Sequence, residues 1–479
     1  MRFFKKLMNV FSVKLADSAK ASNKPTREIA VIGLGVTENA MLSEQALLAL
    51  QSADLVIGSE RQLLTLEKQL AFQPKVEALT EGEQQQVEPK AEVLPPRTEI
   101  IPKLKQLKAL IETEQKVVVL GSGDPLYYGI GTWISKNFHD AAVRFFPAVS
   151  SITQACHSLS IAQQDVNVVS LHGRPLAKLK VELKAQQTLL LLTDKDSMPQ
   201  HIAAICEQTG FTQAEIIVCE RLGYSQQKIS RFSVSELLTA ESEGNLQNFD
   251  ALHVSFVICG ANKGYLPEFP GIKDTDFETG ELGSKGMISK REVRLAILSL
   301  LQPSKNDIIW DIGAGCGGVA VELAYWQPQA KIYAIEHNQA RFDCLLQNQQ
   351  KFGVVNNLIT QFGRAPEVLS EPPFSEQPAA NKIFIGGSDG ALPMLLEMLW
   401  EKLPEGGQIV VSAVMERTKS QLFDFYSIRD KVADSELETL QVAVNKSRTL
   451  GGQLAYKPAL SVSLFSFTKN TQQNQEKEQ

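Results

Sequence analysis

The chain has few of the features that would tie it to a metal, a membrane or nucleic acid. Its six cysteines are scattered over 479 residues without a C-x-x-C pair, so zinc and iron–sulfur spacings are absent. No apolar run reaches the roughly 20 residues needed to span a bilayer. The net charge of −6 argues against nonspecific nucleic-acid binding, which depends on neutralising phosphates. We therefore expect no metal, no nucleic-acid partner and no stable membrane insertion.

What is present is typical of a multidomain globular enzyme. Hydrophobic residues make up 43% of the chain and charged residues 21%, and the length exceeds that of one ordinary core. Unpaired cysteines fit a reducing compartment. We expect a cytoplasmic protein that forms a homo-oligomer.

The composition of successive segments predicts two folded domains. The first residues are basic and amphipathic, which is compatible with a targeting segment, but a disordered extension is the simpler interpretation. Residues 81–97 are polar and proline-bearing and predict a surface loop. A turn-rich stretch marks a boundary near the middle. The predicted segments are an extension at 1–26, a domain at 27–265, a linker at 266–286, a second domain at 287–468 and a disordered tail at 469–479.

Apolar runs alternate with helical patterns in both halves, which predicts an α/β fold. In the second half, helices are expected to separate the first five strands, and the last two strands suggest one reversed strand. Ser289 and Glu292 have the spacing of a capping box. The first expected strand lies within 28–35, where it runs into a glycine turn. The others are expected at 54–58, 116–120, 143–146, 166–171, 188–192, 216–218 and 253–259, then at 307–310, 331–335, 358–361, 382–385, 408–413, 440–444 and 460–467. The expected helices of the first half include 43–53, 100–112, 128–138 and 152–159.

The most informative motif is a glycine-rich turn after a strand in the second half. Asp311 ends the strand, Gly313, Ala314, Gly315, Cys316 and Gly317 form the turn, and Glu336 ends the next strand, 21 positions after Gly315. This order predicts a nucleotide site in which the acid holds ribose hydroxyls. Asp311 favours a cationic ligand, so S-adenosylmethionine (SAM) suits the motif better than NAD. A dehydrogenase using the same turn is the alternative.

Further glycine turns follow other strands. Gly363 to Pro366 and Gly386 to Gly390 follow two strands of the second half, where an adenine and a flat substrate would lie. In the first half, turns at Gly33 and Gly35, at Gly121 to Asp124 and at Pro147 to Ser151 follow three strands. Because ligands bind at the carboxyl ends of parallel strands, we expect a second ligand site in this half.

The ordered motifs resemble the bifunctional C5,C15 methyltransferases of the corrin (vitamin B12) pathway. The first half is similar to tetrapyrrole methylases through VIGLG, GSGDPLYYGIG, PAVSSIT, SLHGR and ERLG. The second is similar to the decarboxylating methylases through GMISKREVR, WDIGAGCGGVAVE, AIEHN, GRAP, FIGGSDG and SRTLGG. The resemblance implies a tetrapyrrole methylase-type α/β domain followed by a Rossmann-like, seven-stranded class I SAM methyltransferase domain.

The resemblance also implies an activity and its residues. The expected substrate is the tetrapyrrole precorrin-6B or its cobalt form, methylated at carbons 5 and 15 with loss of the ring-C acetate as carbon dioxide. Two SAM molecules are expected. The matching motifs carry over as SAM contacts Ser289, Gly313, Ala314, Gly315, Cys316, Gly317, Glu336 and Ala365 in the second half, and Gly121, Ser122, Gly123, Asp124 and Ser151 in the first.

Three cations are candidates for contacts to the carboxylates of such a substrate: Arg364, Lys382 and Arg448. Catalytic residues are not identified. One departure concerns the first half, where relatives usually have Pro-Gly after the first-strand turn and this chain has Val36-Thr37-Glu38. A first half that is a non-catalytic scaffold therefore stays open as an alternative.

Overall fold

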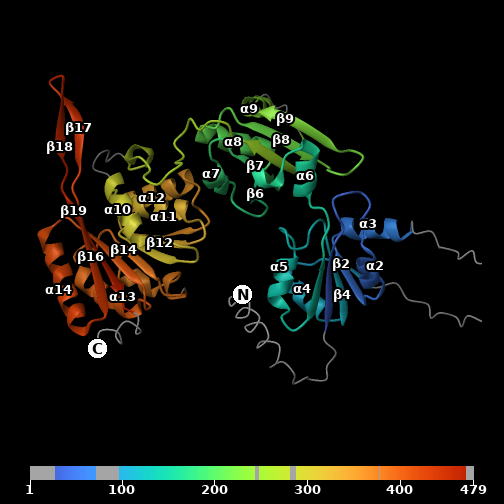
Figure 1. Cartoon of the computed structure of the whole chain (residues 1–479), viewed down its shortest axis with the longest axis horizontal. Helices are drawn as coiled ribbons and strands as arrows, with labels where there is room; N and C mark the ends of the chain where they lie inside the picture. The colour runs from blue at the N-terminus through green and yellow to red at the C-terminus, as the bar shows by residue number, and fades with distance from the viewer. Residues whose placement is uncertain (1–26, 72–96, 243–247, 281–286, 377, 471–479) are drawn as a thin grey trace, which may run out of the picture. The chain divides into compact units, whose positions relative to one another are not determined.

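The computed structural model describes residues 27–71, 97–242, 248–280, 287–376 and 378–470 (Figure 1). The chain forms two compact units, one of residues 1–165, 219–229 and 252–254 and one of the remaining residues. The expected extension at 1–26, nearly all of the expected loop at 81–97 and most of the expected tail lie outside the described residues. In the described part, no helix combines the length and apolarity that a membrane span needs.

A five-stranded parallel sheet with the order β3-β2-β4-β1-β5 forms the core of the first unit. β1 lies between β4 and β5, so the turns that follow these three strands meet at one edge. Ser43 begins the first helix by accepting the Ala46 N–H at 3.2 Å. The elements are β1 (Glu28–Gly33), α2 (Glu44–Gln51), β2 (Leu55–Gly58), α3 (Glu60–Ala71), β3 (Arg97–Ile100), α4 (Leu104–Ile111), β4 (Lys116–Gly121), α5 (Gly131–Asn137), β5 (Ala142–Phe146) and α6 (Ser151–Leu159).

A second five-stranded sheet follows, with the order β6-β7-β10-β8-β9. Its leucine-rich β7 is almost completely buried. In the first unit, the helices expected at 100–112 and 128–138 begin later, at Leu104 and Gly131. Residues 97–100 form the edge strand β3 instead, and residues 128–130 form bends and a turn. The elements are β6 (Asn167–Ser170), α7 (Leu179–Glu182), β7 (Thr188–Leu192), α8 (Pro199–Thr209), β8 (Glu215–Glu220), β9 (Lys228–Ser233), α9 (Val234–Ser242) and β10 (His253–Ile258).

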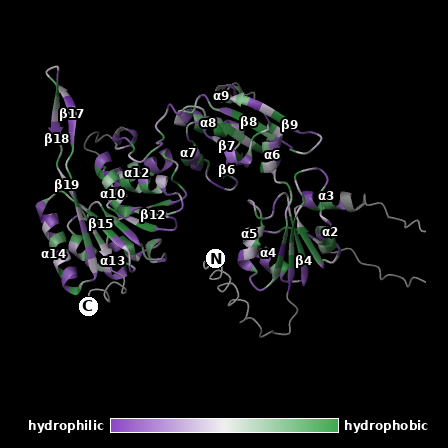
Figure 2. Cartoon of the chain, in the orientation of Figure 1, coloured by the Kyte–Doolittle hydropathy of each residue, from purple (hydrophilic) through white to green (hydrophobic). Residues whose placement is uncertain are grey.

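The last sheet has seven strands in the order β13-β12-β11-β14-β15-β19-β16. Its first five strands are parallel, and β19 is antiparallel to both of its neighbours, which confirms the predicted reversed strand. The central strands are hydrophobic (Figure 2) and buried on both faces. The elements are α10 (Arg291–Leu301), β11 (Ile308–Ile312), α11 (Gly318–Trp326), β12 (Lys331–Glu336), α12 (Gln339–Lys351), β13 (Leu358–Phe362), β14 (Lys382–Ile385), α13 (Leu392–Lys402), β15 (Gln408–Ala413), α14 (Glu416–Val432), β16 (Ser435–Val442) and β19 (Val462–Lys469).

Two predictions for this sheet were wrong. Between β13 and β14 the described residues contain only two short 3-10 turns, Glu367–Ser370 and Phe374–Glu376, where an α-helix was expected. An antiparallel hairpin of β17 (Asn445–Leu450) and β18 (Gln453–Pro458) extends from the sheet between β16 and β19 (Figure 1). Its strands carry mostly polar, exposed residues, so they lack the apolar alternation by which a half-buried strand is recognised.

The stretch expected to be a linker contributes to the core of the second unit. Ile272 and Phe277 are 2% and 5% exposed and belong to the hydrophobic cluster on one face of the seven-stranded sheet. The capping box predicted for α10 does not form: its N-cap is Lys290, and the Arg291 N–H is instead bound by the Asp274 carboxylate at 3.0 Å. At the other end, Lys469 belongs to β19. The domain boundaries at 265 and 287 stay predictions.

Candidate functional site

A cavity of about 850 Å³ opens at the carboxyl edge of the seven-stranded sheet. It lies where β11 has β12 on one side and β14 on the other, the point at which the strand order reverses. Ligands of open α/β sheets bind at such points. Its walls come from the ends of β11, β12, β14 and β15, from residues 287–293 and from the base of the hairpin.

Asp311 is a fully buried carboxylate in the wall of this cavity. Neither of its oxygens makes a well-formed hydrogen bond within the described part of the chain. Burial raises the pKa of Asp311 to about 7, with the nearby Glu336 acting in the same direction, while the Ala320 N–H in the first turn of α11 favours the charged form. A buried carboxylate without a partner is costly, and a cationic ligand would satisfy it.

Glu336 is the acid at the end of β12, and it is 3% exposed. One oxygen accepts the Gly315 N–H at 2.9 Å and the other accepts the Asn338 N–H at 2.8 Å. Two backbone donors therefore fix the carboxylate at the cavity wall. This places the predicted ribose-holding acid beside the predicted glycine turn.

The glycines of the turn are required by the protein's own backbone. Gly313 and Gly315 have φ of +72° and +60°, which side-chain-bearing residues rarely adopt. A Cβ on Gly315 would lie 2.3 Å from the Met287 carbonyl oxygen, and one on Gly313 would lie 2.5 Å from that of Gly387. In the structure, the closest collisions are with neighbouring loops.

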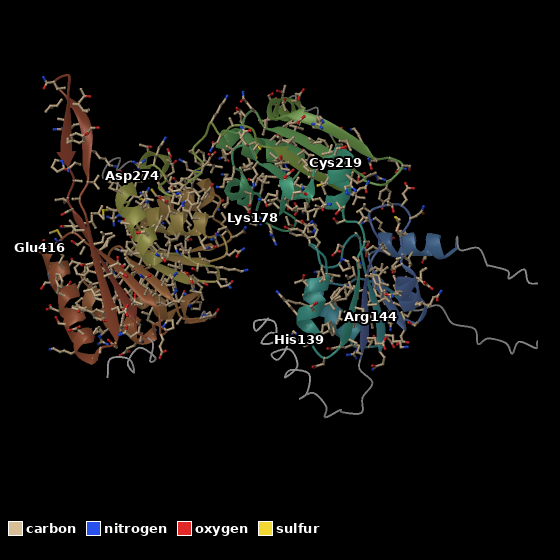
Figure 3. The ribbon with its side chains drawn as sticks, in the orientation of Figure 1. His139, Arg144, Lys178, Cys219, Asp274 and Glu416 are labelled. Carbon is tan, nitrogen blue, oxygen red and sulfur yellow. The ribbon has the colours of Figure 1, made fainter. Side chains whose placement is uncertain are left out.

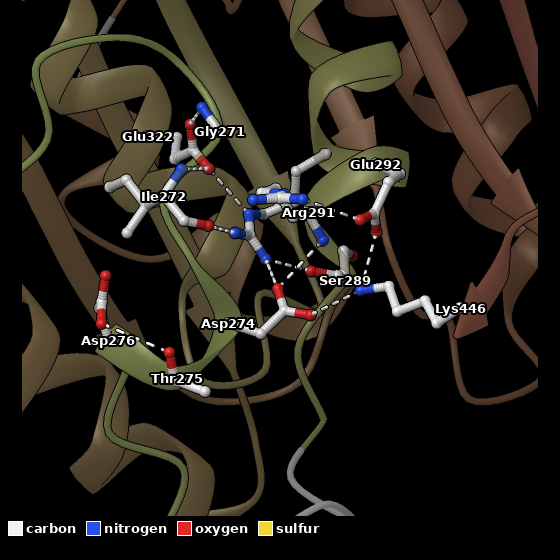
Figure 4. A network of polar contacts seen from close by, with 11 residues as sticks. Gly271, Ile272, Asp274, Thr275, Asp276, Ser289, Arg291, Glu292, Glu322 and Lys446 are labelled. Atoms are coloured by element: carbon white, nitrogen blue, oxygen red, sulfur yellow. Dashed lines mark hydrogen bonds and ion pairs between the residues drawn. The ribbon is translucent and has the colours of Figure 1, made fainter. Parts of the chain in front are cut away.

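A buried arginine holds the residues that cover the turn. Arg294 of α10 is fully buried, and its guanidinium binds Glu322 at 2.9 Å and Asp274 at 2.7 Å. The same group donates to the carbonyl oxygens of Ser289 and Ile272. Figure 4 shows these partners together, and Asp274 is also labelled in Figure 3. The guanidinium thereby fixes Ser289, which lines the cavity.

Several cations also line the cavity. Arg364 pairs with Asp389, and Lys446 at the hairpin base lies 3.1 Å from Glu292 and 4.0 Å from Asp274. Arg364 was predicted from the sequence as a substrate contact, whereas Lys290, Arg341 and Lys446 were not. Lys446 could not be predicted as a cavity residue from the sequence, because the β17–β18 hairpin that carries it was not recognised. Arg341 lies in α12, five residues after Glu336, the last residue of β12. A search of the helix that follows the acid-tipped strand would therefore have found Arg341 as a cavity residue.

The structure brings together most of the residues predicted for this site, but not all. Cys316 and Gly317 do not line the cavity; Cys316 is buried beside Cys344, and burial raises the pKa of its thiol to about 12. Arg448 is an exposed residue of β17 and does not line the cavity. Lys382 begins β14 at the opposite sheet edge, where it binds Asp307 at 2.8 Å. The predicted residues in the lining are Ser289, Asp311, Gly313, Ala314, Gly315, Glu336, Arg364 and Ala365.

In the first unit, the turns that follow β1, β4 and β5 lie against one another. A Cβ on Gly33 would lie 2.2 Å from the Gly123 carbonyl oxygen, and one on Gly123 would lie 3.0 Å from the Ser150 Cα. Asp124 turns its carboxylate to the N–H groups of Leu126 and Tyr127, at 2.8 and 3.0 Å. This contact shapes the loop itself.

The other predicted residues of the first unit surround these turns. Ser122 Oγ accepts hydrogen bonds from Arg61 at 3.0 Å and Gln62 at 2.9 Å. Gly121 ends β4, and Ser151 begins α6 next to its N-cap Ser150. Among the described residues, no group of three or more His, Cys, Asp or Glu is placed to hold a metal ion. All six cysteines are buried, and none forms a disulfide.

The seven-stranded sheet, the glycine turn and the acid-tipped neighbouring strand define a class of enzyme, the SAM-dependent methyltransferases. Residues 28–238 match the family of tetrapyrrole (corrin/porphyrin) methylases, and residues 282–469 match the precorrin methyltransferase domain. A precorrin-6Y C(5,15)-methyltransferase (decarboxylating) of Sinorhizobium sp is 31% identical over 355 residues, which cover 74% of this chain and 80% of that protein. The chain belongs to this family of decarboxylating precorrin-6Y C(5,15)-methyltransferases.

Other relatives fit this membership. The protein of the same name in Mycobacterium tuberculosis (strain CDC 1551 / Oshkosh) is 27% identical over 454 residues, covering 92% of this chain and 100% of that protein. A probable cobalt-precorrin-6B C(15)-methyltransferase (decarboxylating) of Saccharolobus solfataricus is 32% identical over 178 residues, covering 37% of this chain and 84% of that protein.

Proposed function

We propose that the protein methylates a precorrin-6B-type tetrapyrrole at carbons 5 and 15 and removes its ring-C acetate as carbon dioxide, with SAM as the methyl donor at two sites. The family membership supports the reaction type, and the relatives' names give the substrate class. One structural observation carries the assignment of the second site: the unpartnered, buried Asp311 beside the fixed Glu336. We assign C15 methylation and decarboxylation to residues 287–468 and C5 methylation to residues 27–265.

The residues of the cavity fit SAM. Asp311 offers negative charge in a water-poor wall, which favours a ligand bearing ammonium and sulfonium groups. Glu336 has oxygen lone pairs left for ribose hydroxyls after its two backbone contacts. The diphosphate of NAD would be repelled by the Asp311 carboxylate, which argues against the dehydrogenase alternative.

When bound, SAM supplies an electrophilic methyl group and leaves as a neutral thioether. The meso carbons of a reduced tetrapyrrole are enamine-like nucleophiles, so the chain needs mainly to orient the two reactants, which is worth roughly 7–11 kcal/mol. Gly386 and Gly387 line the cavity without side chains and leave room for a flat ring system. On decarboxylation, the C–C bonding electrons pass into the conjugated ring, carbon dioxide leaves and a proton replaces it.

The far part of the cavity suits a tetrapyrrole with carboxylate side chains. Leu395, Val414 and Leu460 supply apolar walls. Arg364 and Lys446 are about half exposed, so both can exchange their present acidic partners for substrate carboxylates. Lys382 and Arg448 are not retained as contacts, because neither lines the cavity.

The test is to incubate the protein with precorrin-6B and isotopically labelled SAM, and to follow product mass and released carbon dioxide. Two added methyl groups with one carbon dioxide lost are expected. A product with no added methyl group would refute the proposal. A product with only the C15 methyl group would leave the second half assigned and would identify the first half as a scaffold.

A further inference from the structure

A segment of the first half, residues 176–184, lies against the second half within one compact unit. Lys180, in α7, is 5% exposed, and its ammonium donates to the Gln350 carbonyl oxygen at 3.2 Å. Gln350 is in the last turn of α12, where carbonyl groups have no helical partner and the helix dipole is negative. Both effects favour a cation at this position and offset part of the cost of burial, which lowers the pKa of Lys180.

Lys184 occupies an aromatic pocket on the same face. Its ammonium lies 2.7 Å from the Tyr325 hydroxyl and 3.3 Å from the Pro267 carbonyl oxygen. It also lies 4.2 Å from the centre of the Tyr325 ring and 5.4 Å from that of Trp326. Cations bind the faces of such rings favourably, and more so when both are partly removed from water.

The backbones of the two halves approach closely beside Lys180. Gly353, just after α12, has a φ of +71°, and a Cβ there would lie 2.4 Å from the Ala177 carbonyl oxygen. Val181 packs against the hydrophobic core of the second half. Lys178, labelled in Figure 3, belongs to the same segment. The contact therefore combines apolar burial, close backbone fit, one buried ammonium group (Lys180) and one partly buried ammonium group (Lys184).

We infer that the face formed by Tyr325, Trp326, Gln350 and Gly353 is a docking surface whose occupant is residues 176–184 of the first half, and that it holds the two halves together without the covalent connection between them. The positive charges of Lys180 and Lys184 determine that this segment is the one that binds the face. Removing an ammonium group from water, fully for Lys180 and partly for Lys184, is unfavourable unless it meets a matched partner, and this face provides a helix end and two aromatic rings. The inference does not depend on the substrate or on either active site.

The experiment cuts the full-length protein. A protease recognition sequence is inserted between Phe269 and Pro270, where Phe269 is 79% exposed. After cleavage, the fragments 1–269 and 270–479 are analysed by size-exclusion chromatography and by analytical ultracentrifugation across a dilution series. We expect the fragments to stay associated.

Substitution tests the role of the lysines. The cleaved Lys180→Met/Lys184→Met protein should show at least tenfold weaker association, because methionine keeps the length but removes the charge. Lys228→Met is the matched control, since Lys228 is 66% exposed and pairs with Glu220. Circular dichroism of each uncut protein checks that it is folded. Separation of the unsubstituted fragments, or undiminished association of the folded double variant, would overturn the inference.

Discussion

The Gly315 N–H donates to the Glu336 carboxylate at 2.9 Å, which ties the glycine turn after β11 to the acid at the end of β12. Glu336 is held at its other oxygen by the Asn338 N–H. Both contacts form within the protein itself, so the carboxylate does not have to be ordered when a ligand arrives. Such preorganisation lowers the entropic cost of binding.

Replacing Glu336 with glutamine should weaken SAM binding to the second half by about 10- to 100-fold. The substitution removes the charge and replaces one acceptor oxygen by a donor, and hydrogen bonds to charged groups contribute roughly 1.5–3 kcal/mol. Isothermal titration calorimetry measures the change. Glu416→Gln, at an 87% exposed side chain, is the control and should bind normally. Unchanged affinity in Glu336→Gln would place the cofactor elsewhere.

The affinity of the second half for SAM should depend on pH through Asp311. Its folded pKa is raised to about 7, and a cationic ligand favours the ionised form, so binding releases a proton below that pKa. Affinity should rise by up to about tenfold per pH unit below pH 7 and level off above it. Titrations from pH 5.5 to 8.5 measure this, and Asp311→Asn should bind weakly with no such rise. An equal rise in the variant would assign the effect to another group.

The same carboxyl group should affect the stability of the ligand-free protein in the opposite direction. The pKa of Asp311 is higher in the folded than in the unfolded chain, so the folded state binds more protons between about pH 4 and 7. The stabilisation that protonated Asp311 contributes to the folded state is fully present below the unfolded pKa and is lost as pH rises through 7. Asp311→Asn should therefore be more stable than the unsubstituted protein at pH 8, as measured by urea unfolding. A less stable variant would contradict this expectation.

Gly315→Ala should destabilise the second half whether or not ligand is present. The left-handed backbone alone costs about 1–2 kcal/mol for alanine, and the new Cβ meets the Met287 carbonyl oxygen at 2.3 Å. Differential scanning calorimetry should show a lower Tm. Gly387→Ala is the matched control, because it has no atoms within 4 Å of its Cβ position. Equal Tm values for the two variants would contradict the backbone argument.

Arg364→Met should raise the KM for the tetrapyrrole by about tenfold and change kcat less, because a contact to a substrate carboxylate that is the same in the ground state and the transition state contributes mainly to binding. Arg448→Met is the control, since Arg448 lies outside the cavity. Steady-state kinetics of carbon dioxide release separates the two constants. A similar KM increase in both variants would indicate a general effect of surface charge.

Glu38→Ala should reduce C5 methylation and leave C15 methylation intact. Glu38 accepts hydrogen bonds from the Ser225 N–H at 3.0 Å and hydroxyl at 2.8 Å, so it fixes the loop that departs from the family pattern. Mass spectrometry of the product distinguishes the two methyl groups. If C5 methylation is unaffected, the anchoring of this loop does not matter for the first half.

The sequence alone determined the α/β class, the seven-stranded sheet and the Asp311–Glu336 pair. These features depend on the order of strand, turn and acid over short stretches of chain, where apolar periodicity and glycine are direct physical signals. Tertiary structure decided the features that unite distant residues: Lys446 at the cavity, Arg294 beneath Ser289, and Lys184 against Tyr325. Such contacts follow from how the elements pack, which no local pattern encodes. Lys382 is the exception. It is the first residue of β14, so the sequence already placed it at the amino edge of the sheet, opposite the carboxyl edge where the cavity lies.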